Sequence, residues 1–65
     1  MPIISVKLAK GRTMDQKRAF AQAVTQAAAD ILAVRPEWVT VLFEELDREN
    51  WATAGVLHAD KPADR

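Results

Sequence analysis

The fold is decided by residues 3–46, which read IISVKLAKGRTMDQKRAFAQAVTQAAADILAVRPEWVTVLFEEL. Ile3 to Leu8 alternates between two faces and is rich in β-branched residues, which predicts a strand. Met14 to about Ala33 has no glycine or proline and carries apolar residues at helical spacing, which predicts one long helix. Trp38 to Leu46 alternates again and predicts a second strand. This order is a β-α-β unit, so the strands should be parallel with a right-handed crossover.

Single residues indicate the ends and the faces of the helix. Thr13 is a typical N-cap with Gln16 three positions later, which predicts a capping box, and Asp15 suits the positive end of the helix dipole. Pro36 disfavours helical backbone at Arg35 and so ends the helical region. We expect an apolar face at Phe20, Val24, Ala27 or Ala28, and Ile31, and a polar remainder at Lys17, Arg18, Gln22, Gln26 and Asp30.

The residues after the second strand predict a short hairpin and a tail. Trp51 to Leu57 follows a polar connection and has a turn signal at Gly55, which favours a small hairpin. The chain is expected to be ordered to about residue 59, with a polar tail at 60–65. Residues 1–65 therefore predict a single domain of the α/β (α+β) class, with two parallel strands, one long helix and a C-terminal hairpin.

A chain of 65 residues with 49% apolar content can bury only a marginal core by itself. Because it has no cysteine, disulfides and thiolate zinc sites are excluded, and the single histidine, His58, cannot form a histidine-based structural metal site. One helix over two parallel strands leaves the other sheet face and both sheet edges open. We therefore expect the chain to form an oligomer.

Charge and hydropathy exclude several classes of partner. Nine basic and nine acidic residues, with a pI near 6.5, argue against a nucleic-acid binder. No apolar run approaches the ~18 residues of a membrane span. Met1 to Ile4 lacks the basic segment that opens a secretory signal. We expect a soluble cytoplasmic protein that binds neither nucleic acid nor a membrane.

Few side chains offer catalytic chemistry, since cysteine, tyrosine and a glycine-rich phosphate loop are all absent. Ser5 has no evident catalytic triad around it and is expected to be structural. His58 lies near the end of the predicted ordered chain and is expected to be solvated or packed. Glu44 and Glu45 point to opposite strand faces and so cannot form a carboxylate pair within one chain.

The N-terminus is the remaining candidate for a catalytic group. Removal of Met1 would expose the secondary amine of Pro2, whereas an attached Met1 makes that nitrogen a tertiary amide without basicity. A free α-amine has a pKa near 8, which an apolar site or a neighbouring arginine lowers. Such an amine could act as a general base at neutral pH without a cofactor.

Several motifs together resemble the 4-oxalocrotonate tautomerase family over residues 2 to 59. They are Pro2 at the start of a strand, Gly11-Arg12-Thr13-x-x-Gln16-Lys17, a strand ending in Glu-Glu-Leu, Asn50-Trp51 and the Gly55 turn. That family has short β-α-β subunits, usually assembled as hexamers that are trimers of dimers. Its members use an unblocked N-terminal proline to move protons in keto-enol or dienol substrates.

The resemblance implies roles for individual residues. Pro2 would be the general base, Arg12 of a neighbouring subunit would bind a substrate carboxylate or carbonyl, and Trp51 would form an aromatic wall. Two positions depart from the family pattern. Thr40 stands where the best-known members carry a second substrate-binding arginine, and Ala9 stands where a larger aliphatic residue often lines the pocket. A substrate with one carboxylate is therefore expected rather than a diacid held at both ends.

The resemblance implies a cofactor-independent, metal-free keto-enol tautomerase or isomerase, a homohexamer acting on a small enolisable carboxylate or carbonyl compound. The same fold also hosts hydratases, dehalogenases and decarboxylases. A non-catalytic subunit of a mixed oligomer is a third hypothesis, which Thr40 keeps open. From the residues alone, Arg12 could contact backbone near the helix start and Trp51 could be a subunit contact. Arg35 and Arg48 lie in polar connections and are expected to be solvated.

Overall fold

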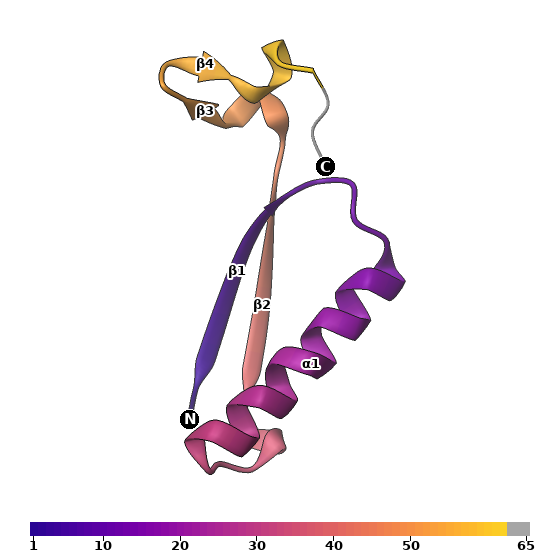
Figure 1. Ribbon diagram of the computed structural model, residues 1–65, viewed down its shortest axis with the longest axis vertical. Coiled ribbons are helices and arrows are strands. Elements are labelled where there is room, and N and C mark those ends of the chain that lie inside the picture. The colour runs from indigo at the N-terminus through magenta and orange to yellow at the C-terminus, as the bar shows by residue number, and fades with distance from the viewer. Residues whose placement is uncertain (63–65) are drawn as a thin grey trace.

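The computed structural model describes residues 1–62 and confirms the β-α-β architecture (Figure 1). Strands β1 and β2 pair in parallel, from Ile3 opposite Thr40 to Ala9 opposite Leu46. A separate antiparallel hairpin follows them, as predicted. The elements are β1 (Ile3–Ala9), α1 (Met14–Leu32), β2 (Thr40–Leu46), β3 (Ala52–Thr53) and β4 (Val56–Leu57), with 3₁₀ turns at Pro36–Trp38, Arg48–Asn50 and His58–Asp60.

The second strand begins two residues later than the alternation predicted. Pro36 to Trp38 forms a 3₁₀ turn, for which the fixed φ of a proline is well suited. The turn is closed because the Trp38 N–H donates to the Arg35 carbonyl at 3.0 Å and the Val39 N–H donates to the Pro36 carbonyl at 3.1 Å. The Arg35 guanidinium lies 5.7 Å from the centre of the Trp38 ring. Trp38 therefore lies outside the sheet, and the prediction for its position was wrong.

The predicted capping box is present at the start of α1. The Thr13 hydroxyl accepts from the Gln16 N–H at 3.1 Å, and the Gln16 side chain accepts from the Thr13 N–H at 2.9 Å. At the other end, Ala33 takes a left-handed conformation with φ of 56°, and its N–H donates to the Ala29 carbonyl. The helix is thus closed at both ends by local hydrogen bonds.

The covered face of α1 differs in part from the prediction. Lys17, expected on the polar side, has a side chain only 20% exposed because it pairs with Glu45 on β2. Ile31, expected on the apolar side, is 80% exposed. At 19 residues α1 is about 28 Å long, whereas the seven-residue strands reach about 23 Å, so its last turn extends beyond the sheet. Ala28, of the two alternatives Ala27 and Ala28, is the buried one.

The two faces of the sheet differ in how far their side chains are exposed to solvent. Side chains that include Val6 and Phe43 are half-buried toward the helix, while Ile3 and Leu42 on the other face are 64% and 53% exposed. Glu44 and Glu45 lie on opposite faces, since Glu45 pairs with Lys17 of the helix and Glu44 lies 4.0 Å from the exposed Lys7. The expectation that they form no carboxylate pair within the chain agrees with this geometry.

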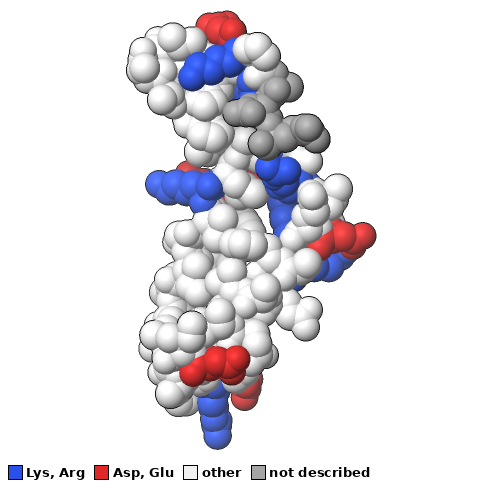
Figure 2. Space-filling model, in the orientation of Figure 1, with Lys and Arg blue, Asp and Glu red and all other residues white. Residues whose placement is uncertain are grey.

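One copy of the chain has almost no core. Within residues 1–62 only Ala28 and Ala29 are buried, and no large side chain is fully enclosed. The radius of gyration is 14.9 Å, against about 11 Å for a compact chain of this length. Figure 2 shows a broad area without charged side chains below the middle of the molecule, above acidic and basic side chains at its lower end, and large apolar side chains such as Ile3 and Leu42 are exposed. Such an exposed apolar surface is typical of a subunit rather than of a monomer.

The C-terminal part is held by Arg48, which contradicts its predicted solvated role. Its guanidinium donates to the carbonyls of His58, of Lys61 at 3.0 Å and of Pro62 at 3.3 Å. Part of the predicted tail is thus bound to the connection that precedes the hairpin, and residues 63–65 lie outside the described residues. In the described part of the chain, no helix combines the length and the apolar character needed to cross a membrane.

Candidate active site

Pro2 and Thr40 lie side by side at one end of the sheet. The Thr40 N–H donates to the Pro2 carbonyl at 3.0 Å, because Pro2 precedes β1 and Thr40 is the first residue of the parallel partner β2. Pro2 is half-buried, while Thr40 is exposed. Pro2, expected to act as base, and Thr40, one of the two residues that depart from the family pattern, therefore share one region within a single chain.

Ala9 and Arg12 lie at the opposite end of β1. The Lys10 N–H extends the ladder to the Leu46 carbonyl at 3.1 Å, and Gly11, with φ of 124°, then turns the chain toward the helix. The Lys10 side chain pairs with Asp47 at 3.0 Å, and this hydrogen bond raises the pKa of Lys10. Pro2 and Arg12 are consequently separated by the whole length of β1, roughly 25 Å.

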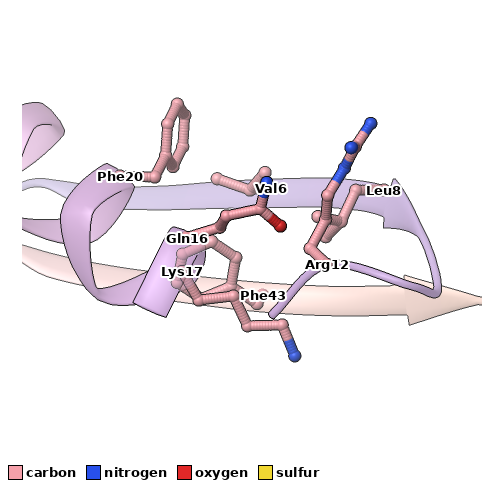
Figure 3. A pocket seen from close by; sticks show the side chains of 7 residues that line it. All are labelled: Val6, Leu8, Arg12, Gln16, Lys17, Phe20 and Phe43. Atoms are coloured by element: carbon pink, nitrogen blue, oxygen red, sulfur yellow. The ribbon is translucent and has the colours of Figure 1, made fainter. Parts of the chain in front are cut away.

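A pocket of about 250 Å³ opens between the start of α1 and the inner face of the sheet (Figure 3). Its apolar lining includes Phe20 and Phe43, whose rings meet edge to face at a centroid distance of 6.2 Å. Arg12 stands at one end of the pocket, beside Leu8 (Figure 3). The full lining is Val6, Leu8, Arg12, Gln16, Lys17, Phe20 and Phe43.

The two cations that line the pocket differ in their partners. The Lys17 ammonium lies 2.8 Å from the Glu45 carboxylate, so its charge is already balanced. Arg12 is exposed and has no acidic partner within residues 1–62. The two charged groups point to opposite sides of the pocket (Figure 3). One unbalanced cation beside an apolar lining can hold a single anionic group of an otherwise apolar molecule.

Trp51 directly precedes β3 of the C-terminal hairpin, which lies away from α1 (Figure 1). Its ring is stacked on His58, with ring centres 4.1 Å apart and planes inclined by 16°. One chain thus places the expected site residues in three separate regions: Pro2 with Thr40, Arg12 with Ala9, and Trp51. Residues 1–62 contain no group of three or more acidic or histidine side chains that could hold a metal ion.

Apart from Arg12, the residues that line the pocket were not predicted as site residues from the sequence. Lys17 and Gln16 appeared there only as helix-start residues, and Phe20 only as part of the apolar face. A usable signal was present, since Val6 and Leu8 alternate on the strand face that an amphipathic helix must cover. The pattern could not indicate that a hollow remains beside the Phe20–Phe43 ring pair.

A family model and a curated protein that match this chain both point to the same family. The family model described as tautomerase enzyme matches residues 2–61. A curated protein from Halalkalibacterium halodurans, named a probable tautomerase, is 38% identical over 61 residues, covering 94% of this chain and 100% of its own length. The family-model match includes β1, α1, β2 and the hairpin.

Solved structures agree with this relationship. A crystal structure of a 4-oxalocrotonate tautomerase homologue superposes with a TM-score of 0.90 at 35% identity, covering 97% of this chain and 100% of the other. A heterohexameric 4-oxalocrotonate tautomerase from Chloroflexus aurantiacus superposes with a TM-score of 0.87 at 27% identity, covering 92% and 97%. The matches extend over nearly the whole length of each protein and support an isomerase of the tautomerase type. The chain belongs to the tautomerase enzyme family.

Proposed function

We propose that the protein is a cofactor-independent tautomerase that uses the secondary amine of Pro2 as general base on a small enolisable monocarboxylate. The observation that carries this proposal is the pocket in which Arg12, which has no acidic partner among residues 1–62, stands beside an apolar lining. Arg12 would bind the carboxylate or the oxygen on which charge develops, while the amine moves the proton between carbon and oxygen. The apolar lining favours a substrate whose remaining atoms are uncharged.

A second copy of the chain would bring the separated parts together. Strand β1 has one open edge, because the sheet order is β1-β2. Antiparallel pairing of two β1 edges about their centre at Val6 would set Pro2 of one copy opposite Lys10 of the other, two residues from Arg12. The base would then lie near the pocket of its neighbour. We therefore propose a homo-oligomer with sites shared between subunits, and hexamers occur in the family, as the Chloroflexus aurantiacus protein illustrates.

Other chemistry on the same fold is the alternative. A hydratase, dehalogenase or decarboxylase would use the same amine, and a non-catalytic subunit of a mixed oligomer would need neither the amine nor Arg12. The pairing of Lys17 with Glu45 and the neutral Thr40 favour a substrate with one anionic group in each of these enzymes. The placement of the protein in the cytoplasm remains a prediction from its sequence.

The test compares two forms of the protein that differ only at the N-terminus. One form has Pro2 exposed, verified by intact mass, and the other carries an uncleavable extension that keeps the Pro2 nitrogen in an amide. Both are assayed for ketonisation of a panel of enol monoacids. We expect the blocked form to lose about 10²- to 10⁴-fold in kcat/KM, the contribution of a general base. Equal oligomeric state by sedimentation is the control, and full activity of the blocked form would refute the assignment of Pro2.

A further inference from the structure

His58 lies at the centre of the contacts that shape the C-terminal hairpin. Its ring stacks on Trp51 with centres 4.1 Å apart, and its Nε2 lies 2.9 Å from the Thr53 hydroxyl. Its N–H donates to the Trp51 carbonyl at 2.7 Å, and its own carbonyl accepts from Arg48. Ring, ring nitrogen, amide and carbonyl of one residue are thus all engaged.

The hairpin has little else to hold it in shape. Strands β3 and β4 are two residues each and form two residue pairs, and they pair with no other strand in residues 1–62. Ala54 and Gly55 both have positive φ, 55° and 80°, as a tight two-residue turn requires. A short two-stranded hairpin is at best marginally stable in water. Contacts beyond its ladder must therefore determine where its side chains lie.

Trp51 is the side chain most affected by this arrangement. Trp51 and Thr53 share one face of the hairpin, because side chains alternate along a strand. His58 directly follows β4, lies over the Trp51 ring and reaches Thr53 on the same face. The imidazole therefore covers one side of the indole.

We infer that His58 is a positioning residue that holds Trp51 as a preformed wall of the substrate pocket in a neighbouring subunit. This inference rests on the proposed function and on the role of aromatic wall that the family resemblance implies for Trp51. His58 itself contacts no reacting atom. When the wall is already fixed, substrate binding does not have to order a large side chain. The effect of His58 is therefore expected on substrate affinity rather than on the chemical step.

The test uses His58→Ala, which removes the stack, and His58→Phe, which keeps an aromatic ring over Trp51. We expect His58→Ala to raise KM about 3- to 10-fold with kcat changed less than about twofold, in line with the strength of an aromatic pair. His58→Phe should restore most of the KM, and Thr53→Val, which leaves the stack intact, should have the smaller effect. Unchanged KM in His58→Ala, or an equal rise in His58→Phe, would overturn the inference.

A double-mutant cycle and a spectroscopic measurement separate this inference from the proposed function. His58→Ala should add nothing in a Trp51→Ala background, whereas an additional loss there would overturn the inference. In a Trp38→Phe background Trp51 is the single tryptophan, and His58→Ala should weaken its near-ultraviolet circular dichroism. An unchanged signal would refute the positioning of Trp51. If the signal weakens but Trp51→Ala leaves kcat/KM unaltered, His58 still holds the ring, and the proposed role of Trp51 in the pocket is what fails.

Discussion

Arg12 and Thr40 determine the charge of the substrate that the proposed site can hold. Arg12 is the cation of the pocket without an acidic partner in residues 1–62, whereas Thr40 can offer only a neutral hydrogen bond. Loss of one donor to a developing oxyanion typically costs about 10²- to 10³-fold in rate. Loss of a neutral hydrogen bond is worth about 0.5–1.5 kcal/mol.

We expect Arg12→Ala to lower kcat/KM about 10²- to 10³-fold, with Arg12→Lys, which keeps the charge, falling in between. Thr40→Ala should be mild, and Thr40→Arg should shift preference toward diacids. The measurement is kcat/KM for a matched monoacid and diacid enol pair in each variant. A strong wild-type preference for the diacid that survives Arg12→Ala would show that the anchors lie elsewhere.

If Pro2 is the general base, kcat/KM should depend on pH, and Arg12 should alter that dependence. An amine is a base only when deprotonated, so kcat/KM should rise with pH through an apparent pKa below the usual value of about 8. A nearby guanidinium disfavours the ammonium form and lowers that pKa, so Arg12→Ala should move the rise to higher pH. Profiles of log kcat/KM against pH for both proteins provide the test. A rise that stays in place in Arg12→Ala would place the guanidinium far from the amine.

At the scale of the elements, α1 depends on its N-cap. Thr13 and Gln16 exchange two hydrogen bonds that satisfy free N–H groups at the start of the helix, whose first turn also carries the pocket residues Gln16 and Lys17. We expect Thr13→Ala to reduce the free energy of unfolding by about 1 kcal/mol, and Thr13→Ser to retain most of it. Urea denaturation at one fixed protein concentration measures both. Equal loss in the two variants would mean that the hydroxyl bond contributes nothing.

For the whole molecule, the exposed apolar surface predicts self-association. Ile3, Leu42 and Ile31 are exposed in a single copy, and only two alanines are buried in residues 1–62. We expect sedimentation to give an oligomer, a hexamer in the proposed assembly, and the midpoint of thermal unfolding to rise with protein concentration. A stable folded monomer at micromolar concentration would contradict this.

A substitution on the open sheet face tests the same point. Leu42 contacts solvent in one copy, so Leu42→Lys should change stability by less than about 0.5 kcal/mol in a monomer. In an oligomer that covers this face, the same change buries a charge and should lower both the oligomer mass and the unfolding midpoint. Leu42→Ile, which keeps the face apolar, is the matched control. Wild-type behaviour of Leu42→Lys would leave this face outside any interface.

The local pattern of residues was sufficient for the elements themselves. Alternation from Ile3 predicted β1, the run without glycine or proline predicted α1, and the Thr13–Gln16 spacing predicted its cap, because each of these depends on neighbours in the chain. The start of β2 was not predictable, since alternation continues through Trp38 whether or not the backbone is extended. The segment forms a 3₁₀ turn because the N–H groups of Trp38 and Val39 donate to the carbonyls of Arg35 and Pro36.

The sequence by itself determined the β-α-β order, the capping of the helix, the family and the residues proposed for the chemistry. The tertiary structure decided which of these residues meet. It placed Pro2 and Arg12 at opposite ends of β1, paired Lys17 with Glu45, and stacked His58 on Trp51. The physical reason is that strand alternation and helix capping act over a few residues. The Lys17–Glu45 ion pair depends on how two elements far apart in the chain lie together, and the Trp51–His58 stack depends on how the hairpin between the two rings folds back.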